Sequence, residues 1–188
     1  SENREAWVYA FMAIWKSGMV AVPVDFLSVA SDVQYIINDC KPSVIFCSVA
    51  RKAVVDEALS GIDILPEIII LDELESKSSD TQIEEINFEN DIKKTAVIIY
   101  TSGTTGKSKG VMLSFENLKT NIDAVSSDIR IYTPDDRILM LLPLHHIFPL
   151  LGTILIPLFV GASIAISPSM ASEDIVRTLK ENRITIII

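Results

Sequence analysis

The sequence predicts an α/β protein in which a layered parallel or mixed sheet is flanked by helices. Segments of strand length alternate along the chain with segments that have the apolar spacing of helices. Most strand candidates are continuously apolar, which is typical of strands covered on both faces of a sheet. Apolar residues make up 49% and charged residues 22% of the 188 positions, so the chain can build a substantial core.

The N-terminal part of the chain contains helices and strands in turn. We expect an apolar helix over residues 4–17, ended by Gly18. Ser31 and Gln34 have the spacing of a capping box, which predicts a second helix that reaches about Cys40. Branched apolar residues and turn signals predict the remaining elements, which are strands at 19–24, 43–48 and 67–71 and a helix at 51–60 stopped by Gly61.

An acidic segment follows. Residues 72–91 hold eight acidic residues and one basic residue, Lys77. Such a run is usually a solvated surface connection, and an acidic docking segment is the alternative. We therefore place a connection at 72–95 between two α/β parts, residues 1–71 and 96–188.

The second α/β part begins with a strand at 96–100 that runs into a polar, glycine-rich loop at 101–110. A short extended segment at 111–113 follows, and Ser114 is a candidate cap for a helix that reaches about residue 127. The same signals predict the later elements, which are strands at 137–142, at 162–166 and from 184 onward, and helices at 148–160 and 173–181.

The charge balance and the cysteines limit the function classes. Sixteen basic and twenty-five acidic residues give a net charge of −9 and no basic stripe, so we predict no nucleic-acid partner. Cys40 and Cys47 are too few for a disulfide scaffold and do not have a usual zinc spacing. We expect no signal peptide, no metal site in this chain and a reduced, cytoplasmic location.

Both ends of the sequence look cut. Residues 184–188 have the composition of a buried strand that stops midway, and domains seldom end inside a core strand. We therefore expect a fragment of a longer protein, whose missing remainder would be its partner.

A long uncharged stretch raises the question of a membrane span. Residues 138–172 carry no formal charge, and 147–166 has the length of a transmembrane helix. Pro149, Gly152, Pro157 and Gly161 interrupt it and favour a helix, a turn and a strand instead. Membrane association is expected to be peripheral at most.

The loop after the strand at 96–100 is the most informative segment. Residues 102–110 hold four hydroxyl side chains, three glycines and two lysines. Glycines expose backbone N–H groups, hydroxyls donate hydrogen bonds and lysines supply positive charge. In open α/β sheets, ligands bind beyond the carboxyl ends of the strands. The segment is therefore predicted to bind phosphate.

Two other interpretations of this loop stay open on the residues alone. It could be a flexible surface turn with solvated side chains. Gly106, Lys107 and Ser108 also match the end of a Walker A motif, as in P-loop NTPases. However, Thr101 stands where the leading glycine is needed, and the residues after the loop look extended rather than helical.

The segment Tyr100-Thr101-Ser102-Gly103-Thr104-Thr105-Gly106-Lys107-Ser108-Lys109-Gly110 resembles the signature of the adenylate-forming, or AMP-binding, enzymes. These are the acyl-CoA synthetases, the luciferases and the adenylation domains of peptide synthetases. The match is complete except that Ser108 stands where proline is usual. Residues 15–25, 111–118 and 142–146 resemble other motifs of the family, so the chain is expected to be part of its large N-terminal domain.

The resemblance implies an activity for the intact protein. A carboxylic acid reacts with ATP, accompanied by Mg²⁺, to give an acyl-adenylate and pyrophosphate, and the acyl group then passes to coenzyme A. The resemblance assigns Lys109 and His146 to the chemistry, with His146 lining the acyl and adenylate pocket. It assigns the ATP phosphates to Thr101, Ser102, Gly103, Thr104, Thr105, Gly106, Lys107, Lys109 and Gly110, with a weaker role for Lys107.

The two histidines and the substrate are less well defined. His145 and His146 are the only histidines, and taken alone such a pair is more often structural than a zinc ligand. Together with the uncharged stretch they resemble long-chain fatty acyl-CoA synthetases, so a fatty acid is the expected substrate. An amino-acid or aryl-acid adenylation domain and a non-catalytic binding module are the alternatives. The adenine, ribose and Mg²⁺ sites and the C-terminal lysine would lie outside this chain, so the fragment alone is expected to be inactive.

Overall fold

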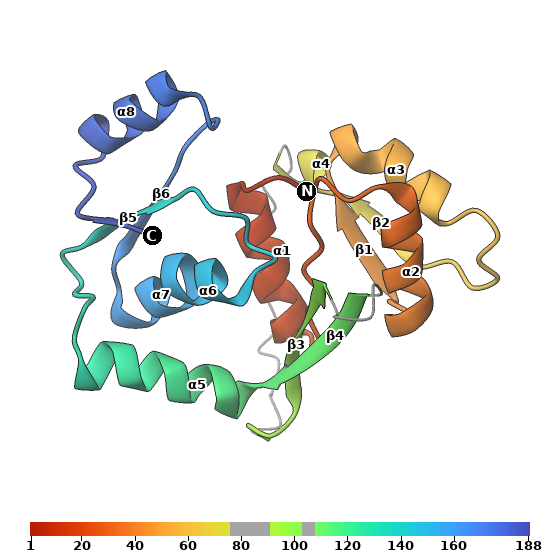
Figure 1. The fold of residues 1–188 in the computed structure, drawn as a ribbon, viewed down its shortest axis with the longest axis horizontal. Helices are drawn as coiled ribbons and strands as arrows, with labels where there is room; N and C mark the ends of the chain where they lie inside the picture. The colour runs from red at the N-terminus through yellow and green to blue at the C-terminus, as the bar shows by residue number, and fades with distance from the viewer. Residues whose placement is uncertain (76–90, 103–107) are drawn as a thin grey trace. The chain divides into compact units, whose positions relative to one another are not determined.

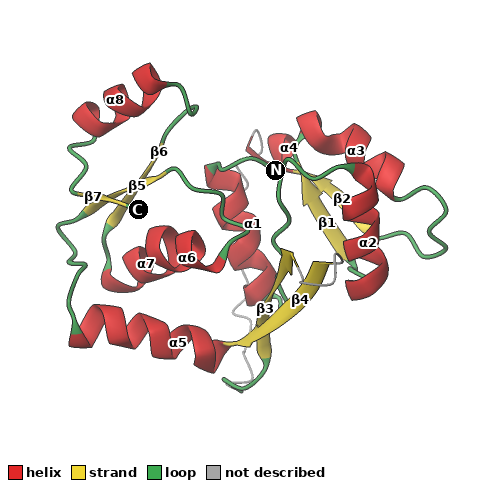
Figure 2. Ribbon diagram, in the orientation of Figure 1, coloured by secondary structure: helices red, strands yellow, loops and turns green. Residues whose placement is uncertain are grey.

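The computed structural model describes residues 1–75, 91–102 and 108–188 (Figure 1). The chain divides into two compact units, Ser1–Glu89 and Asn90–Ile188. Both units combine helices with small sheets, which confirms the predicted α/β class (Figure 2).

In the first unit, two parallel strands are accompanied by helices. β1 (Val44–Cys47) pairs in parallel with β2 (Glu67–Ile70), as expected for strands joined by a helical crossover. Side chains from α2, α3 and the two strands form one core cluster, which contains Ile37, Cys47, Val55, Ala58 and Leu59. The helices of this unit are α1 (Glu5–Lys16), α2 (Ala30–Cys40), η1 (Val49–Arg51), α3 (Lys52–Ala58) and α4 (Leu71–Glu75).

Two predictions for the first unit are wrong. The strand expected at 19–24 is absent, and only Ala21 forms an isolated bridge, because Pro23 has no N–H to donate to a ladder. The capping box of Ser31 and Gln34 is also absent, since α2 begins one residue earlier without a side-chain cap. The Gln34 amide instead donates to the carbonyl oxygens of Ala58 and Ser60, at 3.1 and 2.9 Å, and so satisfies the end of α3.

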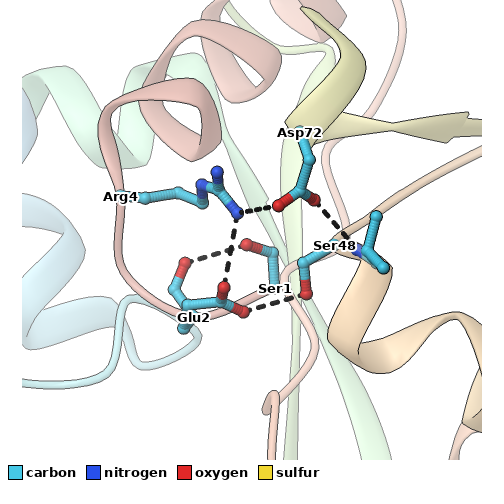
Figure 3. Close-up of polar contacts among 6 residues, drawn as sticks. Ser1, Glu2, Arg4, Ser48 and Asp72 are labelled. Atoms are coloured by element: carbon cyan, nitrogen blue, oxygen red, sulfur yellow. Dashed lines mark hydrogen bonds and ion pairs between the residues drawn. The ribbon is translucent and has the colours of Figure 1, made fainter. Parts of the chain in front are cut away.

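A polar cluster ties the N-terminal segment to the carboxyl ends of β1 and β2 (Figure 3). The Arg4 guanidinium donates to Asp72 Oδ1 at 3.0 Å and to Glu2 Oε1 at 3.3 Å. Asp72 Oδ2 accepts from the Val49 N–H, and Glu2 Oε2 accepts from the Ser48 hydroxyl, both at 2.9 Å. These groups supply one another's hydrogen-bond partners, so the cluster holds the N-terminal segment at this end of the small sheet.

The second unit holds two further sheets. β3 (Thr95–Ser102) and β4 (Ser108–Ser114) form an antiparallel hairpin. β5 (Arg137–Met140) lies between β6 (Ser163–Ile166) and β7 (Ile186–Ile187) and is parallel to both. The main core of this unit lies under the parallel sheet and includes Tyr132, Ile138, Ile156 and Ala162.

The helices of the second unit agree with most of the predictions. Ser114 caps the first of them in a full capping box, in which the Asn117 N–H donates to Ser114 Oγ at 3.2 Å and Asn117 Oδ1 accepts from the Ser114 N–H at 2.9 Å. Residues 147–160 are helical as expected, with a wider π-helical turn in the middle. The helices are α5 (Phe115–Asp123), η2 (Ala124–Asp128), α6 (Ile147–Pro149), η3 (Leu150–Leu155), α7 (Ile156–Val160) and α8 (Ser172–Glu181).

Within the described ranges, none of the helices combines the length and the hydropathy that a membrane crossing requires.

Asp136 joins the amino ends of the three parallel strands. Its Oδ1 accepts from the Thr185 hydroxyl at 2.7 Å, and its Oδ2 accepts from the Thr133 N–H and hydroxyl, both at 2.8 Å. Thr185 Oγ1 in turn accepts from the Arg137 N–H at 2.9 Å, and the Asp136 carbonyl accepts from the Ser163 N–H at 3.0 Å. The hydroxyl of Thr185, followed by the groups of Thr133, lowers the pKa of the Asp136 carboxyl.

We expect Asp136→Asn to remove an acid-sensitive part of the stability of this unit. The folded pKa lies below the unfolded value of about 3.9, so the contribution of the carboxylate is present above about pH 4 and is lost as the pH falls through the folded pKa. Near pH 7 the variant should lose about 1 kcal/mol of unfolding free energy, because the amide nitrogen cannot accept from Thr133 or Thr185. Urea unfolding between pH 7 and 3 would measure this, with the exposed neighbour variant Asp135→Asn as the control. A difference from wild type that does not shrink at low pH would contradict the prediction.

Candidate functional site

The predicted phosphate-binding segment is the connection of the β3–β4 hairpin. The strands extend further than expected, because β3 continues to Ser102 and β4 begins at Ser108. Of the loop predicted at 101–110, residues 103–107 connect the two strands. The register pairs Tyr100 with Gly110, Thr101 with Lys109 and Ser102 with Ser108. Pairing gives the backbone groups of these residues partners that a free loop would not supply.

The ends of the hairpin place two candidate phosphate ligands together. Thr101 and Lys109 are directly opposite each other, so their side chains leave the same face of the hairpin, and both are exposed. The Ser108 hydroxyl donates to the Thr101 carbonyl oxygen at 3.1 Å and closes the strands beside the connection. The hairpin thus presents a hydroxyl and a mobile cation where the connection begins and ends.

The remaining predicted phosphate ligands belong to the connection of the hairpin. Gly103, Thr104, Thr105, Gly106 and Lys107 lie outside the described residues, and Ser102 is placed by its backbone only. Their assignment to the ATP phosphates stays a prediction.

The hairpin does not fit a Walker A motif. In that motif the glycine-rich loop runs directly into a helix, whose N-terminus binds the phosphates. Here an antiparallel strand, Ser108–Ser114, follows the connection, and the next helix begins only at Phe115. The structure therefore argues against the P-loop NTPase interpretation.

The two histidines lie in the turn after β5, at the carboxyl end of the parallel sheet. The chain leaves β5 after Met140 and reaches His146, which is the N-cap residue of α6. The imidazole rings of His145 and His146 pack with their centroids 4.0 Å apart at an angle of 46°. His145 is half-buried and His146 is exposed, so His146 is available to a ligand at this end of the sheet.

Pro149, three residues after His146, is compatible with the local backbone. Pro149 is buried and has helical angles, φ −66° and ψ −35°, near the start of the helix. Its carbonyl accepts from the buried Thr153 hydroxyl at 2.6 Å. The turn that carries His146 is therefore anchored by the helix behind it.

Metal ligation is not favoured around the histidines. Across residues 1–75, 91–102 and 108–188, no group of three or more His, Cys, Asp or Glu side chains is arranged to hold a metal ion. Zinc sites in proteins usually need three or four such ligands.

Sequence reasoning missed one steric feature of the site. Gly110 was assigned to the phosphates, but it lies within β4, opposite Tyr100. A side chain at this position would collide with residues of the neighbouring strand. The alternation of a strand could have indicated this contact if β4 had been predicted to begin at residue 108.

The described residues define an α/β protein with an exposed hydroxyl and lysine at the end of a hairpin and a histidine turn at the carboxyl end of a parallel sheet. Residues 1–188 match the family model described as AMP-binding enzyme. The chain belongs to this family, which confirms the family predicted from the signature.

Known relatives are longer than this chain. The mitochondrial malonate–CoA ligase ACSF3 of Homo sapiens is 32% identical over 176 residues, which cover 92% of this chain and 30% of that protein. The long-chain-fatty-acid–CoA ligase ACSBG2 of Homo sapiens is 37% identical over 117 residues, which cover 62% of this chain and 18% of that protein. The chain thus spans about 30% of the length of the relatives that it matches almost throughout. The malonate–CoA ligases match 91–92% of this chain and the long-chain ligase matches 62%, so the comparisons show an acid–CoA ligase family and do not show the long-chain type predicted from the sequence.

Solved structures agree with the fold. The o-succinylbenzoate CoA synthetase MenE of Bacillus subtilis, in complex with its acyl-adenylate intermediate, has a TM-score of 0.81 and 25% identity over 98% of this chain and 46% of that chain. ATP-bound MatB of Rhodopseudomonas palustris has a TM-score of 0.82 and 24% identity over 100% of this chain and 37% of that chain.

Proposed function

We propose that the intact protein is an ATP-dependent acid–CoA ligase and that this chain supplies its phosphate-binding hairpin. The observation that carries the proposal is the signature at 100–110, which falls on the connection of a hairpin in a chain that matches the AMP-binding enzyme family over its whole length. CoA ligases among its relatives and solved structures with ATP or an acyl-adenylate support the same activity.

In this proposal the reaction has two steps. The carboxylate oxygen of the acid attacks the α-phosphorus of ATP, the bond to the β-phosphate oxygen breaks, and pyrophosphate leaves. The sulfur of CoA then attacks the acyl carbon, and AMP leaves. Magnesium enters with ATP as part of that substrate.

The residues of this chain contribute positioning and charge. Thr101 and the loop hydroxyls would donate hydrogen bonds to the β- and γ-phosphates, and Lys109 would neutralise charge that builds up on the departing pyrophosphate. His146 would donate to the acid or to the adenylate from its exposed position at the N-cap of α6. The remaining loop residues assigned from the sequence would complete the cradle.

The proposed acid is a small, malonate-type dicarboxylic acid. Malonate–CoA ligases from several animals are 28–32% identical over 91–92% of this chain, which supports this choice. A second carboxylate needs a donor, and the uncharged stretch 138–172 contains only His145 and His146 as ionisable candidates. A fatty acid is the second candidate, because the 117-residue match to a long-chain ligase has the higher identity and the same stretch is strongly apolar.

A pyrophosphate-exchange assay on the intact protein tests both levels of the proposal. Malonate, octanoate, palmitate, benzoate and a mixture of amino acids would each be offered with ATP and Mg²⁺. We expect exchange with malonate. Exchange with palmitate alone would show that the substrate is a fatty acid and not a malonate-type acid. Exchange only with amino acids would place the protein among peptide-synthetase domains. No exchange with any acid would refute ligase activity.

Two earlier expectations stay predictions: the inactivity of the 188-residue chain alone and the cytoplasmic location. Exchange by the isolated chain above that of a Lys109→Ala control would contradict the first. Cell fractionation followed by immunodetection would test the second.

A further inference from the structure

Gly110 occupies a position in the hairpin where a side chain would require its neighbours to move. A Cβ atom built on it would lie 2.8 Å from Ile98 Cγ2, 3.2 Å from Tyr100 Cζ and 3.4 Å from Tyr100 Oη. The first distance is shorter than a real Cβ contact allows, and the second requires the tyrosine ring to move. The strand register explains why, because Tyr100 is directly opposite Gly110 and Ile98, two residues before Tyr100 in β3, lies on the same face.

The need for glycine is steric rather than conformational. The φ angle of Gly110 is not positive, unlike those of Gly18, Gly61 and Gly161, so its backbone conformation is one that other residues adopt. Glycine within a strand is unfavourable because it gains no side-chain packing and orders a flexible backbone. Glycine at position 110 allows the Tyr100 ring and the Ile98 side chain to approach the backbone of β4 closely.

This packing lies next to the functional part of the hairpin. The pair Tyr100–Gly110 is followed by Thr101–Lys109 and then by Ser102–Ser108, where the connection begins. A slip of one residue in the register would move Lys109 to the opposite face from Thr101. The side chains that pack beside Gly110 therefore lie one residue pair away from Thr101 and Lys109.

We propose that Gly110 is a positioning residue, against which Tyr100 and Ile98 pack to hold Thr101 and Lys109 side by side at the ATP phosphates. The inference rests on the proposed ligase function and deepens it. It gives Gly110 a role in the geometry of the hairpin in place of the direct phosphate contact predicted from the sequence.

The test uses the intact protein and a compensating pair of substitutions. Gly110→Ala is expected to lower kcat/KM for ATP roughly 10- to 100-fold, because small displacements of positioning groups have effects of this size. The KM for the carboxylic acid should stay within about twofold, since the acid does not bind at the hairpin. Ile98→Ala removes the methyl group at 2.8 Å, so the double variant Gly110→Ala/Ile98→Ala should recover most of the loss relative to Ile98→Ala alone.

Gly61→Ala is the matched control. Gly61 lies in the first unit with a φ of +81° and open space around the position of its Cβ, so alanine there causes backbone strain without a collision. It should lower stability and leave kcat/KM for ATP unchanged. If Gly110→Ala does not fold, Tyr100→Leu replaces it as the test, because it removes the ring that packs beside Gly110 and should raise the KM for ATP selectively.

The outcomes separate this inference from the proposed function. If the wild-type protein is active and Gly110→Ala keeps kcat/KM for ATP within about twofold, or if Ile98→Ala gives no recovery, the positioning role is refuted while the ligase function stands. If the wild-type protein activates no acid, the proposed function fails and the inference fails with it.

Discussion

Replacing Lys109 with alanine is expected to lower the ATP-dependent adenylation rate of the intact protein by roughly 100- to 1000-fold, the usual cost of removing one preorganised charge-stabilising group. Lys109 stands opposite Thr101 at the end of the hairpin and is exposed, so its cation can reach a bound phosphate. The chain as a whole carries a net charge of −9, which repels a triphosphate. The Lys109 cation is therefore expected to have a large effect on ATP binding and on the stabilisation of the negative charge that develops in the reaction.

Pyrophosphate exchange at saturating acid would measure this effect. Lys119→Ala is the matched control, because Lys119 is an exposed lysine of α5 in the same unit, paired with Asp123 one helical turn away. Its removal should change the rate less than about twofold, since such surface pairs contribute little. Lys109→Arg keeps the charge with a different shape and should give an intermediate rate. Equal losses of exchange rate for Lys109→Ala and Lys119→Ala would show that Lys109 is not part of the phosphate-binding site.

Ile138→Ala is expected to destabilise the second unit by about 2–5 kcal/mol, the usual cost of a cavity in a packed core. Ile138 is 0% exposed and belongs to the central strand of the parallel sheet, where it pairs with Ile164 on one side and Ile186 on the other. The cavity would open within the core cluster that Ile138 shares with Tyr132, Ile156 and Ala162.

Amide hydrogen exchange of the intact protein would localise this loss to β5, β6 and β7. Ile129→Ala is the control, because Ile129 is the same residue type in the same unit and is 66% exposed. It should cost less than about 0.5 kcal/mol. Similar losses of protection for the two variants would mean that Ile138 does not carry the core of the sheet.

The predictions that succeeded depend on short-range patterns. The helix after Ser114 was predicted from its cap, and Asn117 completes the box because both residues are within one turn. Gly161 ends α7 with a positive φ, and Gly61 has a positive φ in the turn that follows α3, a conformation that glycine adopts at little cost. The continuously apolar strands at 44–47 and 137–140 are parallel and largely shielded, as the run of branched side chains predicted.

The predictions that failed depend on distant partners. Ser31 and Gln34 have the spacing of a cap, but the carbonyl oxygens at the end of α3, 24 and 26 residues away from Gln34, take its amide. Residues 19–24 have strand composition, but only Ala21 forms a bridge. The strands of the hairpin reach to Ser102 and from Ser108 because each supplies the hydrogen-bond partner of the other.

The order of residues at 100–110 was enough to predict the family, which the family model confirms, and to predict phosphate binding from the chemistry of hydroxyls, glycines and lysines, which stays a prediction. Only the tertiary structure decided that this segment joins two antiparallel strands, that Lys109 stands opposite Thr101, and that Gly110 leaves room for Tyr100 and Ile98. These facts depend on which strand pairs with which and in what register, and register is a property of two segments packed together rather than of either one.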